Sequence, residues 1–329
     1  MKKRSVYSQI LRIKYKNSII KTRLTVSVPS ITNYTGCDPN FRWDYSKYNG
    51  SGITIAVVDT GIYNHTALSG RVLHGKDFTG SGTANDTDGH GTHVAGIIAS
   101  NHPLYRGVAP GVSLINVKAL GSTGVGNSFW VIEGIEWALI QNNFSVDIIT
   151  MSAGATAEAN GTNGFACFVD YIVKYFNVMW INAAGNNGAT ASIDVPGDAY
   201  NCITVGNIDD KNTINRDDDS ISSTSSRGPT DDIPRIKPDI CAPGENIISC
   251  NNGLGFVQKS GTSMATPHVA GAAALLWQYY HKNPIFGISE NYYPMLIKAI
   301  LLHTAEDMGT PGPDYTYGFG YIDLVNANK

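Results

Sequence analysis

From about residue 50 onward, the chain alternates short apolar runs with longer stretches of helical hydrophobic spacing. The short runs are rich in β-branched residues and predict buried strands, whereas the longer stretches predict helices. The expected strands are residues 53–58, 112–120, 147–151, 178–184 and 202–205. The expected helices are residues 90–100, 128–142, 165–176, 263–280 and 294–304. This alternation favours an α/β fold, in which helices cover both faces of a mainly parallel sheet.

The same pattern indicates one large domain with an N-terminal extension. No Pro/Ser-rich linker divides residues 50–326, and no internal repeat is visible in them. We therefore expect an extension over residues 1–26 and a folded domain over residues 27–329. An Asp-rich stretch at residues 209–219 predicts a surface loop.

Charge is distributed unevenly between these two parts. Residues 1–26 contain eight Lys and Arg and no Asp or Glu, which gives the extension a formal charge of +8. Since the whole chain has a net charge of −3, the remainder carries −11. A cationic arm of this kind could dock on the acidic body, bind an outside polyanion, or be a solvated tail.

The cysteines and the apolar runs indicate where in or outside the cell the protein is located. None of the five cysteines belongs to a C-x-x-C pair, and Cys202 and Cys241 lie in apolar runs that predict burial. The longest uncharged run, residues 260–281, is interrupted by Gly, Thr, Ser, Pro and two His, so it predicts a buried helix and not a membrane span. No apolar signal-peptide core follows the basic N-terminus, which together with the odd cysteine count favours an intracellular over a secreted location.

Three positions supply candidate chemistry. Asp59 ends an apolar strand, His90 begins a helix of small residues, and Ser263 begins the apolar helix. Each residue alone has a structural reading, because a strand-end Asp caps turns, His residues pack in cores and Ser caps helices. Together they are the groups of an activated serine nucleophile, which needs a base and a residue to orient that base.

These positions lie in motifs that resemble those of the subtilases, the subtilisin-like serine proteases. The matching segments are Val57–Gly61 for the Asp motif, His90–Gly96 for the His motif, Gly261–Pro267 for the Ser motif and Ala183–Asn186 for the oxyanion motif. The similarity extends over about residues 27–326. It implies a single subtilisin-like domain with a mainly parallel sheet of about seven strands.

The resemblance implies a serine endopeptidase and gives each residue a role. Ser263 attacks the scissile carbonyl, His90 accepts and returns the proton, and Asp59 orients His90. The side-chain amide of Asn186 and the backbone N–H of Ser263 stabilise the oxyanion. His93 and His268 are expected to be structural, and no metal site is expected at His90 and His93.

The resemblance also implies a groove in which polypeptide substrate binds as an added β-strand. Its walls would be Gly124, Val125 and Gly126 on one side and Ser152, Ala153 and Gly154 on the other. Asp194 falls near the floor of the first specificity pocket and Asp88 beside the second. Carboxylates at both places favour Lys or Arg in the substrate.

Two features depart from the family. The residues before the domain are too few for a folding pro-domain, so we expect the basic arm to lie in or near the acidic cleft and to be trimmed there, unless a pro-region is missing from this sequence. The tight calcium site lacks its ligands, because Leu68 replaces an Asp and the loop at residues 101–107 has no carboxylate. We therefore expect no required cofactor, while weak calcium sites elsewhere stay open.

The sequence also leads to expectations about a nucleic-acid partner and about alternative functions. No nucleic-acid partner is expected. Two further functions stay open: a catalytically silent regulator that binds peptides, and a processing or transpeptidating enzyme of the same fold.

Overall fold

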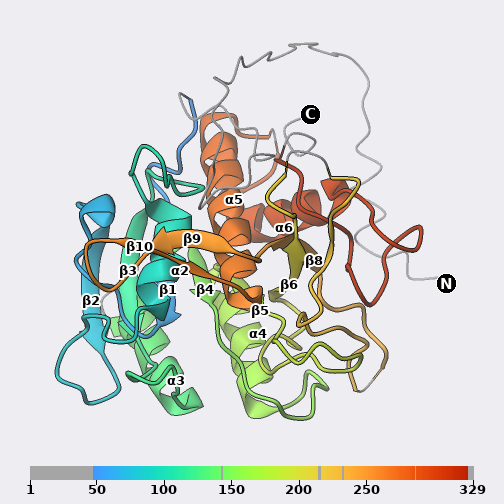
Figure 1. Cartoon of the computed structure of the whole chain (residues 1–329), viewed down its shortest axis with the longest axis horizontal. Helices are drawn as coiled ribbons and strands as arrows, with labels where there is room; N and C mark the ends of the chain where they lie inside the picture. Colours follow the sequence, from blue (N-terminus) through green and yellow to red (C-terminus); the bar gives the residue numbers. More distant parts are fainter. Residues whose placement is uncertain (1–46, 142–143, 214–215, 232, 286, 325–329) are drawn as a thin grey trace. The chain divides into compact units, whose positions relative to one another are not determined.

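The computed structural model describes residues 47–141, 144–213, 216–231, 233–285 and 287–324 (Figure 1). All described residues belong to the second of two units into which the chain divides, Asn33–Lys329. The basic arm at residues 1–26 and Cys37 lie outside the described residues.

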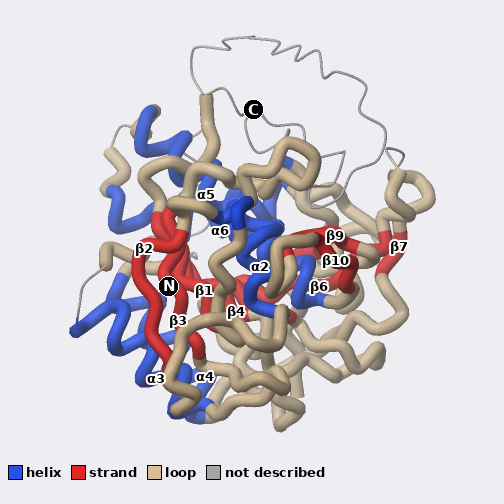
Figure 2. Tube along the Cα trace, turned by 60° about the vertical axis from the view of Figure 1, so that its left-hand side comes forward, coloured by secondary structure: helices blue, strands red, loops and turns tan. Residues whose placement is uncertain are grey.

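A mainly parallel sheet forms the centre of the second unit (Figure 2). Its described parallel strands, in spatial order, are β2 (Val72–Asp77), β3 (Ser113–Lys118), β1 (Thr54–Asp59), β4 (Ile148–Met151), β5 (Met179–Ala183), β6 (Ile203–Asp209) and β8 (Ile240–Pro243). The short β7 (Ser220–Ile221) pairs with β6 in the antiparallel direction. The predicted fold class and the five predicted strands are confirmed. The sequence pattern did not predict β2, β7 or β8.

Side chains of the central strand β1 enter two separate cores. Ile55 and Val57 belong to one core, and the intervening Ala56 and Val58 belong to the other. Successive side chains of a strand point to opposite faces, so burial on both faces requires a continuous apolar run. This requirement explains why the strand could be recognised from sequence.

Helices cover both faces of the sheet, as predicted. Buried residues of α2 (His90–Ala99), α5 (Thr262–Lys282) and α6 (Tyr293–Thr304) share the core of Ile55, whereas α3 (Ser128–Glu136) and α4 (Gly164–Phe176) share the other. Short helices are η1 (Thr66–Leu68) and η3 (Glu290–Tyr292), and a π-helical turn, η2 (Trp137–Gln141), follows α3. The single helix predicted at 128–142 therefore changes its hydrogen bonding part-way.

An antiparallel hairpin, which was not predicted, packs against α2. It consists of β9 (Ile247–Cys250) and β10 (Phe256–Lys259). The His93 Nε2 lies 3.1 Å from the Ile247 carbonyl and 3.0 Å from the Val257 carbonyl, and burial lowers the pKa of His93 to about 3. A neutral histidine that donates one ring proton to the hairpin has a structural role.

Three smaller predictions concern the burial of two cysteines, the exposure of the Asp-rich segment and the absence of a membrane span. Cys202 and Cys241 are buried, as expected. The Asp-rich segment connects β6 to β7, but Asp210 and Asp219 are buried, so the prediction of a surface loop was wrong for these two residues. Their polar side chains are enclosed by the fold, which a count of charges cannot reveal. No helix in the described ranges is long and apolar enough to cross a membrane.

Candidate active site

The carboxyl ends of four neighbouring strands bring the predicted residues to one edge of the sheet. In spatial order, β3 leads to the segment Gly124 to Gly126, β1 ends at Asp59, β4 leads to Ser152, and β5 leads to Asn186. Parallel strands place all of these ends on the same side, which is where open α/β sheets bind ligands. The helices α2 and α5 begin at this edge with His90 and Thr262–Ser263.

Asp59 and His90 form a close pair. Asp59 is 1% exposed, and its Oδ1 lies 2.7 Å from His90 Nδ1 and accepts the Thr60 N–H at 2.7 Å. Burial by itself lowers the pKa of His90, but the charge and hydrogen bond of Asp59 outweigh it, so the net pKa of His90 is raised from 6.5. Because Nδ1 donates to Asp59, Nε2 of the neutral ring is the nitrogen that can accept a proton.

Two glycines allow α2 to begin against the end of β1. A Cβ atom at Gly91 would lie 2.2 Å from the Gly61 carbonyl and 3.0 Å from Asp59 Cβ. Gly61 itself has a φ of 107°, and a Cβ there would lie 2.5 Å from the Ala84 carbonyl. The backbones therefore touch with no side chain between them, and this contact brings His90 to Asp59.

The local sequence also explains the position of Ser263. Gly261 has a φ of 141°, which glycine adopts without strain, and its carbonyl accepts the N–H groups of Met264 at 2.9 Å and Ala265 at 3.4 Å. Pro267 has no N–H to donate to the carbonyl of Ser263, four residues earlier. The Ser152 hydroxyl supplies that donor at 3.0 Å and so ties α5 to the end of β4.

The Ser263 hydroxyl makes a hydrogen bond that the sequence did not indicate. It donates to the backbone carbonyl of Ser152 at 3.0 Å, and not to His90. The structure therefore brings Asp59 and His90 into direct contact, while the hydroxyl of Ser263 is turned toward Ser152 at the end of β4.

Asn186 is oriented by the first residue of α5. Its Oδ1 accepts the Thr262 N–H at 2.9 Å and the Thr262 hydroxyl at 3.1 Å. A backbone N–H can only donate, so the atom facing it must be the oxygen and not the nitrogen of the amide. The Nδ2 donor is therefore not the amide atom that contacts Thr262, and Asn186 is exposed.

The segment of Gly124, Val125 and Gly126 lies at the surface. Val125 is 69% exposed, and Gly126 forms an antiparallel bridge with Leu120. A Cβ at Gly126 would lie 2.3 Å from the Ala119 carbonyl, so only glycine fits there.

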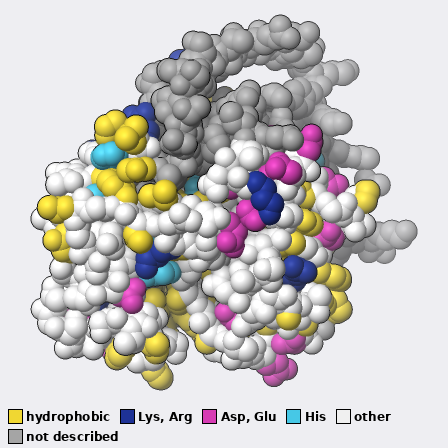
Figure 3. Space-filling view, in the orientation of Figure 1, with side chains coloured by type: hydrophobic (Ala, Val, Ile, Leu, Met, Phe, Trp, Pro, Cys, Tyr) yellow, Lys and Arg dark blue, Asp and Glu magenta, His cyan; other side chains and the backbone are white. Residues whose placement is uncertain are grey.

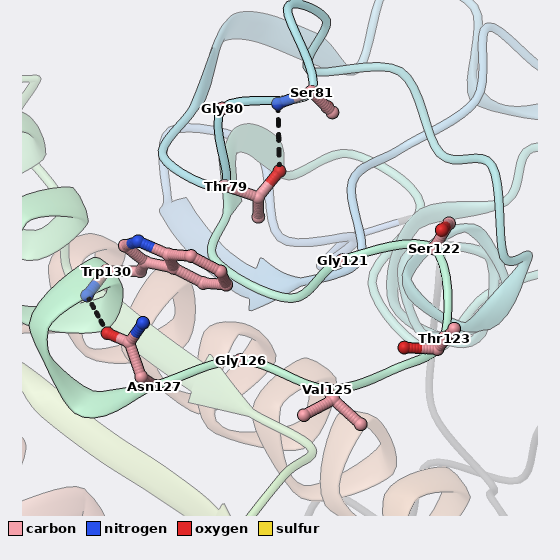
Figure 4. A pocket seen from close by; sticks show the side chains of 10 residues that line it. All are labelled: Thr79, Gly80, Ser81, Gly121, Ser122, Thr123, Val125, Gly126, Asn127 and Trp130. Atoms are coloured by element: carbon pink, nitrogen blue, oxygen red, sulfur yellow. Dashed lines mark hydrogen bonds between the residues drawn. The ribbon is translucent and has the colours of Figure 1, made fainter.

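A cavity of about 470 Å³ lies beside this segment. Figure 4 shows the Trp130 indole projecting toward the space between the turn of Thr79 to Ser81 and the loop of Gly121 to Gly126. Sequence reasoning missed this cavity, because its two walls, which end and begin at Ser81 and Gly121, are 40 residues apart in the chain.

The segment of Ser152, Ala153 and Gly154 lies against Asp194. A Cβ at Gly154 would be 2.7 Å from Asp194 Cβ, and one at Gly185 would be 2.5 Å from Asp194 Oδ2. Asp194 is half-buried, and its Oδ1 accepts from Asn187 at 3.1 Å and Thr156 at 3.2 Å. Burial raises the pKa of Asp194, and these two hydrogen bonds partly oppose the rise.

Asp88 has the structural role that its turn sequence allows. Its Oδ1 accepts the backbone N–H of His90 at 3.1 Å, and its charge contributes to raising the pKa of His90. Lys259, on β10, acts in the opposite direction and was not a sequence candidate. On the face in Figure 3, Asp and Glu side chains gather mainly on the right-hand half, over the part that holds β6 and β8.

Comparison with known proteins identifies the family. Residues 50–320 match the sequence profile of the subtilase family. The chain belongs to the subtilase family. The predicted resemblance is therefore confirmed, and membership of this family supports a hydrolase of the serine protease class.

Three subtilases illustrate the similarity. Serine protease AprX of Bacillus subtilis (strain 168) is 38% identical over 308 residues, which cover 84% of this chain and 66% of AprX. Subtilisin E of the same strain is 40% identical over 288 residues, covering 85% of this chain and 66% of subtilisin E. Subtilisin of Bacillus pumilus is 39% identical over 288 residues, covering 85% of this chain and 92% of that protein.

The electrostatics of this subtilase site yield a first prediction. Lys259→Gln removes a positive charge that opposes protonation of His90, so the pKa of His90 should rise above its value in the unsubstituted chain. NMR titration of the His90 ring measures this shift, and added salt should reduce it. Lys174→Gln, on α4 across the sheet, is the matched control and should leave the titration unchanged. An unchanged or lowered pKa in Lys259→Gln would contradict the proposed coupling.

Proposed function

We propose that this subtilase is a serine endopeptidase that hydrolyses peptide bonds through Asp59, His90 and Ser263. The observation that carries the proposal is the 2.7 Å contact between a buried carboxylate and His90 at the sheet edge where α5 presents Ser263. A serine hydroxyl becomes a nucleophile when a neutral imidazole removes its proton, and the carboxylate stabilises the imidazolium that forms.

In the proposed reaction the Ser263 hydroxyl must turn from Ser152 to His90. We propose that rotation about the Cα–Cβ bond makes this turn, because catalytic hydrogen bonds commonly tighten only when substrate is bound. Ser263 Oγ then bonds to the scissile carbon while its proton passes to His90 Nε2. His90 returns the proton to the leaving amine, and water releases the acyl group by the same steps in reverse order.

Two donors support an oxyanion site next to Ser263. The N–H groups of Thr262, Met264 and Ala265 have acceptors, whereas that of Ser263 has none among the described residues. The Asn186 Nδ2 donor is oriented by the contact of Oδ1 with Thr262. A helix N-terminus with one uncommitted N–H favours the negative charge that develops on the carbonyl oxygen.

We propose further that substrate lies between Gly124–Gly126 and Ser152–Gly154 with a basic side chain before the scissile bond. Asp194 supports this preference, because its Oδ2 lies over Gly185 next to Asn186 and makes no hydrogen bond within the described ranges. Lys or Arg could pair with that oxygen in a partly desolvated pocket. Asp88 would add negative charge beside a second pocket.

The family's tight calcium site does not fit the residues present. Leu68 is buried in the core and offers no oxygen ligand from its side chain. In the loop at residues 101–107, Asn101 bridges to Arg106, and the rings of His102 and Tyr105 contact the Phe256 ring at tilted angles. Because calcium requires six to eight oxygen ligands, we propose that the fold needs no calcium at this place.

Two expectations concern the partners. The basic arm, proposed to lie in or near the cleft and to be trimmed there, is outside the described residues and stays a prediction. A nucleic-acid partner is not proposed, since the charge outside residues 1–26 is negative.

Labelling with a fluorophosphonate tests the proposed nucleophile. Ser263→Ala should lose both labelling and hydrolysis of a peptide library, whereas Asn186→Ala should lower kcat by about 10²–10³. The exposed Ser289→Ala is the matched control and should behave like the unsubstituted chain. No labelling of the unsubstituted chain would favour a silent peptide-binding regulator, and ligated products in mass spectra would favour a transpeptidating enzyme.

A matched peptide pair tests the specificity. Asp194→Asn should reduce kcat/KM for an Arg peptide by about 10- to 100-fold, the range of a charge-assisted hydrogen bond, and leave that for a Phe peptide nearly unchanged. Since burial raises the pKa of Asp194, the preference for Arg should weaken as the pH falls and this carboxylate is protonated. Asp170→Asn on α4, which also removes an acceptor of backbone N–H groups, is the control. Faster cleavage after Phe or Leu than after Arg in the unsubstituted chain would refute the preference.

Metal removal tests the calcium proposal. In the Ser263→Ala background, EDTA should leave the thermal unfolding midpoint unchanged, and millimolar calcium should not raise it, because a ligand stabilises only the state that binds it. A midpoint that falls in EDTA and recovers with calcium would show that a calcium site exists.

A further inference from the structure

One buried carboxylate outside the proposed triad accepts five hydrogen bonds in the turn before α2. Asp86 is 2% exposed. Its Oδ1 accepts from the Thr60 hydroxyl at 2.9 Å and from the N–H groups of Asp88 and Gly89 at 3.0 and 2.9 Å. Its Oδ2 accepts the N–H of Thr92 at 2.9 Å and the hydroxyl of Thr92 at 2.5 Å.

The two threonine hydroxyls form reciprocal bridges between the end of β1 and the start of α2. Thr60, which follows Asp59, accepts the N–H of Gly91, which follows His90, at 2.9 Å. Thr92, on α2, accepts the N–H of Tyr63, on the loop after β1, at 2.9 Å. Each hydroxyl can accept a backbone N–H in this way because its own proton is directed to Asp86.

Strand β3 anchors the turn that carries Asp86. The Asn116 amide donates to the Ala84 carbonyl at 2.8 Å, and the buried Lys118 ammonium donates to the Asn85 carbonyl at 2.8 Å. Asp86 therefore follows two backbone groups that are fixed to the sheet, and its carboxylate has a defined position relative to β1.

We propose that Asp86, Thr60 and Thr92 form a positioning clamp that holds His90 at hydrogen-bonding distance from Asp59. The clamp rests on the proposed function, because its purpose is the geometry of the acid–base pair. Through Thr60 it joins the residue after Asp59 to the residue after His90, and through Thr92 it joins α2 to Tyr63 on the loop after β1. A change in either bridge therefore alters how the two segments that carry the pair approach each other. The side chains of these three residues make no hydrogen bond to the side chains of Asp59, His90 or Ser263, so they act through the position of His90, while the backbone N–H of Thr60 donates to Asp59 Oδ1.

The hydrogen-bonding capacity of a carboxylate explains why Asp is suited to this place. A carboxylate accepts at both oxygens and can orient both hydroxyl protons inward. An amide would present an NH₂ group either to the backbone N–H groups of Asp88 and Gly89 or to that of Thr92, and these groups can only donate, so they would lose their acceptor. The contact between Gly61 and Gly91 has no side chain to hold it, so the bridges are the polar connection between these segments.

Valine substitution of the threonines tests the clamp without removing the carboxylate. In Thr60→Val, Asp86 Oδ1 keeps two donors, but the N–H of Gly91 loses its acceptor. We expect kcat to fall on the order of 10- to 100-fold with little change in KM, as for a misplaced catalytic group. Thr60→Ser restores the hydroxyl and should recover most of the rate, and Thr92→Val and Thr92→Ser should form a second such pair.

The protonation of His90 is the readout that a merely structural role would not change. The charged and titratable groups acting on His90 are Asp59 on β1, Asp88 before α2, His93 on α2 and Lys259 on β10. Loosening the contact with Asp59 reduces the effect that raises the pKa of His90. In Thr60→Val, the acidic limb of kcat/KM and the NMR titration of His90 should therefore both move to lower pH.

Thr230→Val is the matched control, because Thr230 is also a buried threonine that accepts a backbone N–H, from Arg235, and donates to a backbone carbonyl, that of Ile233. It should lose stability without a change in kcat or in the pKa of His90. Thr60→Val behaving like Thr230→Val, at equal folded fraction, would overturn the clamp. If the unsubstituted chain fails to cleave peptides, the proposed function fails, and the NMR titration alone still decides on the clamp.

Discussion

The site depends on the backbone contact between the first turn of α2 and the end of β1. Gly61 and Gly91 touch there: a Cβ at Gly91 would meet the Gly61 carbonyl, and a Cβ at Gly61 would meet the carbonyl of Ala84 in the turn before α2. A contact without side chains gains little from hydrophobic burial, so hydrogen bonds must define its geometry. Asp59 and His90 are neighbours of the two glycines, and the length of their hydrogen bond follows from how closely the segments approach.

The two helices that begin at this edge satisfy their first N–H groups in different ways. Every helix leaves four N-terminal N–H groups without a partner inside the helix. In α2, Thr60 and Asp86 accept those of Gly91 and Thr92, which fixes the helix to the strand. In α5, the Gly261 carbonyl and the Asn186 oxygen serve most of the first turn and leave Ser263 open. One helix start is therefore built for rigidity and the other keeps a donor available.

The sequence predicted those features that depend on local pattern. Buried parallel strands need continuous apolar runs, so β1, β3, β4, β5 and β6 were recognisable, whereas β2 has a mostly exposed sequence and was missed. Asp59, His90, Ser263 and Asn186 were found through motifs, and the structure gathers them at one edge. Asp86 was not singled out, because an Asp in a turn has many roles and one of its donors, the Thr60 hydroxyl, lies 26 residues earlier in the chain.

The hydrogen bond from the Ser263 hydroxyl to the Ser152 carbonyl also could not be predicted from the sequence, because it depends on a contact between α5 and the end of β4. Pro267 leaves the carbonyl of Ser263 without its helical donor, and Ser152 fills that place with its own hydroxyl. The same residue then offers its carbonyl to the hydroxyl of Ser263. Ser152 thus contacts the hydroxyl and the carbonyl of the proposed nucleophile through a strand end that is also a proposed wall of the substrate groove. Substrate pairing with that wall would compete for the Ser152 backbone and free the hydroxyl to turn toward His90, which would link occupation of the groove to activation of the nucleophile.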